Sequence, residues 1–389
     1  MTTQTAPDTD SVDLAEFRST VRAFANAEIH PGAAARDESK EFPAQLVKRL
    51  GQQDLMGISV PEEFGGLGLS TRTQLVAIEE VARTDAALAS IYTAHYLGLE
   101  PILVGGSEEQ KHRWLPQLAS GELLAGFALT EPDAGSDIAS MRTVARREDD
   151  GWHLSGSKTY ISNAKEADLV VLFAKTDPSA GFRGITAFVV PKGTPGISYS
   201  EPQDKMGIRS APDVHRLPRR RRSAARLRDR HRRSRRQHCL DRPEPSTHRR
   251  SGNGKRHRFA RLGTGTRVRN GAKAVRHADL RLPGNPATPR WLRRATCRIT
   301  RHRRLGRDVK DAGQDIRRAA SISKYVATEA CFSIVDQTVQ IHGGAGFMRE
   351  SEIERLYRDC RILRIFEGTS QIQLLTIAGN APSPRSTEF

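Results

Sequence analysis

Apolar residues recur at helical spacing along the first third of the chain. Residues three and four positions apart form one face of an amphipathic helix, which begins with Leu14, Phe17, Val21 and Phe24. The same spacing predicts further helices over 42–50, 75–89 and 94–104. Ser107, followed by two glutamates and Gln110, has the pattern of a capping box that begins another helix. We therefore predict an all-helical domain over residues 11–125.

The pattern changes after Gly126, where short apolar runs alternate with turn residues. Runs rich in β-branched and aromatic residues, bounded by Gly, Pro or Asp, are typical of strands and occur at 152–161, 168–174 and 184–190. No helical pattern separates these runs, so we predict a small antiparallel sheet or barrel over 126–213.

From residue 214, about ninety residues show neither helical nor strand periodicity, and the sequence there is rich in arginine and interrupted by proline. Amphipathic stretches return at 316–330, 332–341, 351–357 and 370–378, which predicts a second helical domain over 310–381. The ends, 1–10 and 382–389, are expected to be disordered tails. The N-terminal tail has neither an apolar signal core nor an Arg-rich transit pattern.

The distribution of charged residues divides the chain at the same places. The 389 residues include 62 Lys and Arg against 45 Asp and Glu, a net charge of +17. About half of the basic residues and few of the acidic ones lie in 214–309, so the rest of the chain is net negative. A basic excess by itself suggests a partner that carries phosphate, such as nucleic acid or an anionic membrane. No apolar run approaches the roughly 20 residues of a membrane span.

The four cysteines are scattered and form no C-x-x-C pair, so neither a disulfide framework nor a zinc site is indicated. We expect no bound metal, and a reducing cytoplasm is the simplest compartment.

Two stretches of the central domain combine hydrogen-bonding groups with glycine. The first, LTEPDAGSD over 129–137, places hydroxyls beside Gly135, whose missing Cβ lets a ligand approach closely. An ordinary turn explains it equally well. The second, GSKTYISNA over 156–164, places Tyr160 on a strand, where its ring could pack on a flat cofactor, although a core tyrosine is the commoner case.

A third stretch, FEGTSQIQ over 366–373, places Glu367 in an apolar loop before a helix that Thr369 or Ser370 would cap. A carboxylate in such a setting can have a raised pKa and act as a general base, but capping the helix is its commoner role. The GGAGF sequence at 343–347 is not a dinucleotide fingerprint, because it follows a helical stretch and lacks the rest of G-x-G-x-x-G.

Taken together, these stretches resemble the acyl-CoA dehydrogenase family over 14–209 and 311–379. LTEPDAGSD and FEGTSQIQ are long and specific, and they occur in the family's order. Supporting matches are GSKTYISNA, DKMGIRS at 204–210, QIHGGAGF at 340–347 and YRDCRI at 357–362. The resemblance implies an α+β multidomain fold with an N-terminal helical bundle, a central antiparallel β-barrel and a C-terminal helical bundle. It also implies FAD, a homotetramer, an acyl-CoA substrate and an electron-transfer flavoprotein as acceptor.

The resemblance further implies a role for each matched position. Glu367 would remove the α-proton of a fatty acyl thioester while the β-hydrogen leaves as hydride to the flavin, and Gly368 would contact the substrate. The Glu367 amide and a flavin ribityl hydroxyl would hold the thioester carbonyl. Ser136 would also face the CoA side. The FAD contacts would be Phe127, Leu129, Thr130, Ser136, Tyr160, Ile161, Ser162, Thr369 and Gln371, with Gln340, Gly343 and Gly344 reaching a neighbouring subunit's FAD. Glu367 at this position favours short- to medium-chain straight acyl groups.

The family pattern breaks at 214–309, where a last barrel strand and two helices are expected. Codons permitted for 219–224, read one nucleotide later, can spell Asp-Asp-Val-Ala-Val-Pro, the end of the family's barrel strand. Codons permitted for 272–279, shifted the same way, can spell Arg-Lys-Gln-Phe-Gly-Thr-Pro, its cofactor motif. We hypothesise a frameshift that enters near His215 and leaves near Gly306. DNA with an unshifted frame through codons 212–310 would contradict it.

The physical consequence is a disrupted first half of the C-terminal bundle. Residues 214–309 have too few apolar positions in period to pack as two helices, and their like charges oppose compaction. Ala272 stands where the family has its cofactor arginine, and no Asp-x-x-Arg substrate pair is visible. We therefore expect the chain as written to hold FAD weakly or not at all, which puts its activity and its tetramer in question.

The alternative function is nucleic-acid binding by the basic segment 214–309 on an acyl-CoA dehydrogenase-like scaffold, and such binding would depend steeply on salt. The segment replaces the family's helices at similar length instead of adding to them, which disfavours this alternative.

Overall fold

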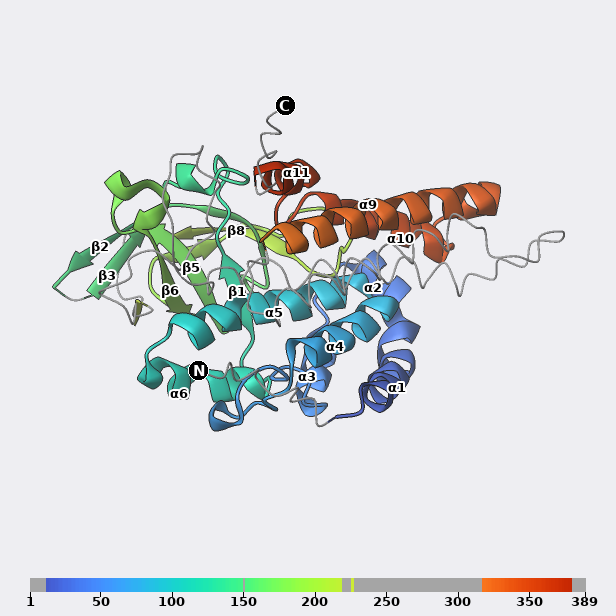
Figure 1. Cartoon of the computed structure of the whole chain (residues 1–389), viewed down its shortest axis with the longest axis horizontal. Helices are drawn as coiled ribbons and strands as arrows, with labels where there is room; N and C mark the ends of the chain where they lie inside the picture. The colour runs from blue at the N-terminus through green and yellow to red at the C-terminus, as the bar shows by residue number, and fades with distance from the viewer. Residues whose placement is uncertain (1–11, 150, 219–224, 227–316, 380–389) are drawn as a thin grey trace, which may run out of the picture. The chain divides into compact units, whose positions relative to one another are not determined.

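The computed structural model describes residues 12–149, 151–218, 225–226 and 317–379 (Figure 1). They belong to two compact units, Met1–Cys239 and Leu240–Phe389. Both predicted tails and residues 227–309 of the basic segment, including Ala272, lie outside the described residues. Within the described ranges, no helix has both the length and the apolar character needed to cross a bilayer.

The first unit begins with helices whose starts are fixed by side-chain caps. Asp13, Ser70 and Asp85 each accept hydrogen bonds from backbone N–H groups of the following turn. The capping box predicted at Ser107 and Gln110 is present. The helical elements are α1 Leu14–Phe24, η1 Ala25–Ile29, η2 His30–Gly32, α2 Ala33–Ser39, α3 Ala44–Gln52, η3 Glu62–Phe64, α4 Thr71–Thr84, α5 Ala86–Gly105 and α6 Glu108–Ala119.

The border between α4 and α5 lies at Asp85, and the predicted break between residues 89 and 94 is wrong. The Asp85 carboxylate accepts hydrogen bonds from the N–H groups of Ala87 and Leu88 at 2.9 and 3.0 Å, which begins α5 there. Most residues of α5 are buried, so its apolar side chains are not confined to one face. Helical periodicity is weak in such a helix, and the sequence pattern could not locate its start.

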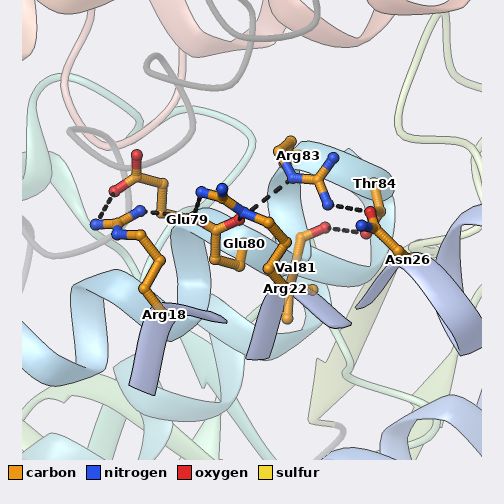
Figure 2. A network of polar contacts seen from close by, with 8 residues as sticks. All are labelled: Arg18, Arg22, Asn26, Glu79, Glu80, Val81, Arg83 and Thr84. Carbon is orange, nitrogen blue, oxygen red and sulfur yellow. Dashed lines mark hydrogen bonds and ion pairs between the residues drawn. The ribbon is translucent and has the colours of Figure 1, made fainter. Parts of the chain in front are cut away.

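An ion-pair network fastens α1 to α4 (Figure 2). The fully buried carboxylate of Glu80 faces the guanidinium groups of Arg18, Arg22 and Arg83, at 2.6, 2.9 and 3.2 Å. Arg18 also reaches Glu79, at 3.2 Å. Charge-assisted bonds to arginine are among the stronger polar contacts in proteins, so this network orients α1 on the helical layer.

We expect Glu80→Gln to lower the free energy of unfolding by about 2 kcal/mol, because three guanidinium groups lose their shared buried anion while remaining partly hydrated. Urea denaturation at pH 7 measures the loss. Glu28→Gln is the matched control, because it removes the same charge from an exposed pair with Arg49. Equal losses in the two variants would contradict a special role for the buried carboxylate.

After α6, the described part of the first unit contains two β-sheets. One has the strand order β3-β2-β5-β6-β9, with β1 also paired to β5, and the other has the order β4-β8-β7. The strands are β1 Ala125–Ala128, β2 Val144–Glu148, β3 Gly151–Ser155, β4 Lys158–Ser162, β5 Leu169–Lys175, β6 Ile185–Pro191, β7 Ile197–Tyr199, β8 Asp213–Pro218 and β9 Ala225–Arg226, with 3₁₀ turns at η4 Ile138–Ser140 and η5 Pro178–Gly184. β8 and β9 lie where no strand period was found, and their ladders need only backbone groups.

The described strands form open sheets and not the predicted antiparallel β-barrel. β1 and β2 both pair with β5 in parallel. β4 precedes β5 in the chain but leaves its sheet and pairs with β8, so it does not close the first sheet. The segment between β1 and β5 is long enough for the crossover that parallel pairing requires.

β5 is buried on both faces, which explains its unbroken apolar run. Leu169, Val171 and Phe173 point into a core that they share with α5 and α6. Val170 and Leu172 point to the opposite face and pack with β3, β4 and β6. Strand side chains alternate between faces, so two covered faces leave no polar position.

His95 ties α5 and α6 to the start of β1. Its Nδ1 accepts a hydrogen bond from the Ala125 N–H at 3.1 Å, so the proton is on Nε2, which donates to the Leu118 carbonyl at 3.1 Å. Burial lowers the pKa of His95 to about 4, so the ring is neutral at pH 7. Close by, a Cβ added to Gly98 would lie 2.6 Å from the Gly126 carbonyl oxygen. These contacts fix the strand that leads into LTEPDAGSD.

The second unit contains, within the described residues, α9 Arg317–His342, η6 Gly343–Phe347, α10 Glu352–Arg361, η7 Ile362–Arg364 and α11 Ser370–Gly379. α9 is continuous where two stretches were predicted, since Cys331 between them is buried in its apolar face. The GGAGF stretch is a 3₁₀ turn after a helix, which agrees with rejecting a dinucleotide fingerprint. The core consists of Ala327, Cys331, Ile334, Val335, Ile353, Cys360 and Leu363.

Candidate functional site

LTEPDAGSD leaves the end of β1 and is held in place by a buried ion pair. Lys158 begins β4 with no solvent exposure, and its Nζ donates to the Leu129 carbonyl at 2.9 Å and to Glu131 Oε1 at 2.7 Å. Glu131 also accepts hydrogen bonds from the N–H groups of Arg142 and Thr143, at 2.6 and 3.0 Å. The loop is therefore tied at one carboxylate to β4 and to the chain entering β2.

Both members of this pair are charged at pH 7. Burial lowers the pKa of Lys158 to about 8, and the Glu131 carboxylate opposes that effect. Burial raises the pKa of Glu131, but Lys158 and the hydrogen bonds to the carboxylate outweigh it and hold the pKa below its usual value. Sequence reasoning missed the pair, because its members are far apart in the chain and neither lies in a pattern that marks a buried charge.

The four candidate residues of this region differ in exposure. Phe127 and Leu129 are half-buried against the core, with the Phe127 ring 5.0 Å from that of Phe173. Thr130 is half-buried, and its carbonyl accepts a hydrogen bond from the Thr159 N–H at 2.9 Å, which ties the loop to β4 a second time. Ser136 is exposed. The loop's two hydroxyl side chains, Thr130 and Ser136, are thus both at least partly accessible.

β4 presents Tyr160 outward. Its side chain is 66% exposed and its φ is +56°, a left-handed conformation that is uncommon outside glycine. The pairing of β4 with β8 shifts register between Lys158 and Ile161, and such an irregularity re-aims a side chain. Tyr160 is therefore not a core tyrosine, the commoner alternative weighed from sequence.

The other two candidates on β4 point differently. Ile161 is 2% exposed, and its side chain packs in the core between the sheets. A cofactor contact by Ile161 must therefore come from its backbone. Ser162 Oγ donates to Asp213 Oδ1 at 2.7 Å, and Lys205 Nζ lies 2.9 Å from the other oxygen of that carboxylate. Lys205 and Asp213 were not candidates, and they fix the hydroxyl of Ser162.

In the second unit, Glu367 lies in the turn between η7 and α11. It is half-buried with φ +53°, and Gly368 follows with φ +90°. Gln373 Nε2 donates to the carbonyl oxygens of Glu367 and Gly368, at 3.3 and 3.1 Å. Two consecutive left-handed residues are uncommon, and strained backbone of this kind clusters at functional sites.

The helix cap is Thr369, not Glu367. Thr369 Oγ1 accepts a hydrogen bond from the Ile372 N–H at 3.3 Å at the start of α11. The alternative in which Glu367 caps this helix is therefore not what the structure shows.

The remaining candidates of the second unit are at its surface. Gln340 is exposed near the end of α9, and Gln371 is exposed in the first turn of α11. Gly343, with φ +57°, and Gly344 are exposed, and a Cβ added to either would meet nothing within 4 Å. Their backbone is open to a ligand.

Three family models match the chain in order: the N-terminal domain of acyl-CoA dehydrogenase over 11–122, the middle domain over 126–217 and the C-terminal domain over 274–381. Residues 218–273, between the last two matches, belong to the basic segment.

Curated relatives match almost end to end. An acyl-CoA dehydrogenase of Bacillus subtilis is 35% identical, over 93% of this chain and 96% of its own length. The mitochondrial short-chain specific acyl-CoA dehydrogenase of Bos taurus is 36% identical, over 95% of this chain and 91% of its own. Among solved structures, butyryl-CoA dehydrogenase from Megasphaera elsdenii aligns with a TM-score of 0.79 at 28% identity, covering 95% of this chain and 98% of that one.

Proposed function

Because the chain belongs to the acyl-CoA dehydrogenase family, we propose that it performs FAD-dependent α,β-dehydrogenation of a fatty acyl-CoA thioester to the trans-2-enoyl-CoA. The family uses acyl-CoA substrates and an electron-transfer flavoprotein and is generally FAD-dependent. The observation that carries the proposal is the loop of Glu367, a carboxylate held in a left-handed turn beside Gly368 and not used as a helix cap.

The described residues fit a flat ring system with polar edges. Tyr160 offers an exposed ring, Thr130 and Ser136 offer accessible hydroxyls, and a Cβ added to Gly135 would meet nothing within 4 Å. We assign these residues, with Phe127, Leu129, Ser162 and the Ile161 backbone, to FAD. In the second unit we assign Thr369 and Gln371 to FAD, and Gln340, Gly343 and Gly344 to the FAD of a neighbouring subunit. When bound, FAD supplies the acceptor for the hydride that leaves the β-carbon.

The chain's own chemistry in this proposal is proton removal. A carboxylate oxygen of Glu367 takes the α-proton of the thioester, and the electron pair of that C–H bond becomes the new double bond. The Glu367 N–H donates to the thioester carbonyl, which acidifies the α-carbon. Gly368 contacts the substrate, and Ser136 also faces its CoA portion. The base acts once per turnover and returns its proton to solvent.

We propose a short- to medium-chain straight acyl group as substrate. Support comes from Glu367, which occupies the base position near the C-terminus. Branches of the family that place their base on an earlier helix do not need a carboxylate at this position. Support also comes from the cattle relative, named as short-chain specific, and from the butyryl-CoA dehydrogenase fold neighbour. We further propose an electron-transfer flavoprotein as acceptor and a homotetramer as assembly.

The test uses the purified full-length chain with added FAD. We expect little flavin to copurify, because Ala272 stands where the family has its cofactor arginine. With FAD in excess, butyryl-CoA or octanoyl-CoA should bleach the flavin absorbance under anaerobic conditions and yield the 2-enoyl-CoA, identified by mass spectrometry. Absence of bleaching at saturating FAD would contradict the proposed function. Stoichiometric flavin in the purified chain would contradict the expected weak binding.

A further inference from the structure

Lys324 is a buried lysine on α9 that no motif in the sequence singled out. Its side chain is almost fully enclosed, at 5% exposure, and its Nζ donates to the carbonyl oxygen of Gly368 at 2.7 Å. An ammonium group is costly to bury unless it is paired, so its presence needs a partner. The carbonyl that it binds belongs to the residue directly after Glu367.

The turn that carries Glu367 has little freedom around this contact. The Gly368 carbonyl accepts from both Lys324 Nζ and Gln373 Nε2, at 2.7 and 3.1 Å. Gly368 has a φ of +90°, a backbone conformation that L side chains rarely adopt, so the turn favours glycine there. These donors, on α9 and α11, thus fix the peptide group that follows Gly368.

A second contact fixes the same loop to α9. Glu329, on the next turns of that helix, accepts hydrogen bonds from Arg364 Nε at 2.9 Å and from Ser370 Oγ at 2.6 Å. These residues flank Glu367 in sequence. The loop is therefore tied to α9 at both ends by Glu329 and near its middle by Lys324.

Charge gives Lys324 a further effect on Glu367. Burial lowers the pKa of Lys324 to about 8, and the carboxylates of Glu367 and Glu329 oppose that effect, so the lysine is charged at pH 7. Arg364 already pairs with Glu329, at 2.8 Å. The Glu367 carboxylate raises the pKa of Lys324, so the two charges attract each other, and a nearby cation favours the ionised form of a carboxylate.

We infer that Lys324 is the positioning residue of the base: through the Gly368 carbonyl and its own charge, it aims the Glu367 carboxylate and keeps it ionised. Only an ionised carboxylate can accept the α-proton, so both effects serve the same step. The inference rests on the proposed role of Glu367 in catalysis, but the coupling of the two side chains can be measured without it.

The first experiment is a pH titration of the full-length chain labelled with [δ-¹³C]glutamate, without FAD or substrate. Glu367→Gln identifies the Glu367 resonance by its loss. In Lys324→Gln, which keeps a donor for the Gly368 carbonyl and removes the charge, the midpoint of the Glu367 titration should move up by about one pH unit. Lys324→Arg keeps the charge and should leave the midpoint in place. Thr328→Val, which removes a buried hydroxyl bonded only within α9, is the matched control and should also leave it in place.

The second experiment measures kcat and KM at saturating FAD across pH. Lys324→Gln should move the acidic limb of kcat/KM to higher pH by the same amount as the resonance. Lys324→Met removes the charge and the donor together, and should lower kcat by a further ~10-fold or more while KM changes less. Thr328→Val should shift neither limb.

An unmoved Glu367 titration in both Lys324→Gln and Lys324→Met would overturn the inference, whatever happens to the rates. Equal rate losses in Lys324→Met and Thr328→Val, without a pH shift, would overturn it as well, because they would mark a merely structural lysine. A moved titration in a chain that never bleaches FAD would support the coupling and contradict the proposed function instead, so the two failures are distinguishable.

Discussion

Replacing Glu367 by Gln is expected to slow anaerobic bleaching of bound FAD by butyryl-CoA by about 10³-fold, within the usual range for removing a general base. The amide has the shape of the carboxylate but cannot take the α-proton. The backbone should keep its left-handed turn, since the hydrogen bonds to Gly368 involve main-chain oxygen and do not depend on the Glu367 side chain. Stopped-flow absorbance at saturating FAD and butyryl-CoA gives the rate.

FAD affinity separates this result from a damaged fold. Quenching of flavin fluorescence should give the same dissociation constant for Glu367→Gln and the parent chain. Glu352→Gln, which removes an exposed carboxylate of the same unit, should leave the rate unchanged. Glu367→Asp keeps the charge on a shorter side chain and should retain part of the rate. A Glu367→Gln rate within about threefold of the parent would place the base on another residue.

The candidate site shows how far local sequence patterns reach. The capping box at Ser107 acts over three residues, so the sequence predicted it correctly. The outward orientation of Tyr160 depends on how β4 pairs with β8, and the sequence of β8 shows no strand periodicity. The parallel pairing of β1 with β5 joins segments more than forty residues apart, and the barrel prediction failed on it. Periodicity describes one element at a time, whereas pairing is a property of two.

The two specific motifs have a common support that sequence reasoning missed. Lys158 and Lys324 are the buried lysines among the described residues, and each lies on an element other than the motif that it supports. Each donates to a main-chain carbonyl of its motif, Leu129 or Gly368. Each also balances a motif carboxylate, Glu131 or Glu367. Burying a cation is costly unless it is paired, so two buried lysines bonded to the motif loops indicate that the geometry of these loops must be fixed.

Lys158→Met is expected to lower the free energy of unfolding of the first unit by about 3–5 kcal/mol at pH 7, because it leaves the Glu131 carboxylate buried without its cation. Urea denaturation followed by tryptophan fluorescence gives the free energy. Hydrogen exchange should show lost protection in peptides that cover 125–148, and much less change in those that cover 14–39. Lys192→Met is the matched control, since that lysine is exposed and its Nζ donates to the Glu166 carbonyl, at 3.2 Å.

Dependence on pH distinguishes the lost charge from lost packing. In the parent chain the pKa of Glu131 is held below its usual 4.5, so the pair stabilises the fold above that value and less as pH falls through the lowered pKa. In Lys158→Met, only the hydrogen bonds from the N–H groups of Arg142 and Thr143 still oppose burial, so the pKa of Glu131 should rise relative to the parent chain and protonation relieves the penalty in acid. The loss of unfolding free energy should therefore be largest at pH 7 and shrink below about pH 4.5.

A second substitution tests the same point. Adding Glu131→Gln to Lys158→Met should recover part of the stability at pH 7, since no uncompensated charge remains. A loss that is equal at pH 7 and pH 4, and that the second substitution deepens, would mean that Lys158 acts through its methylene stem and not through its charge.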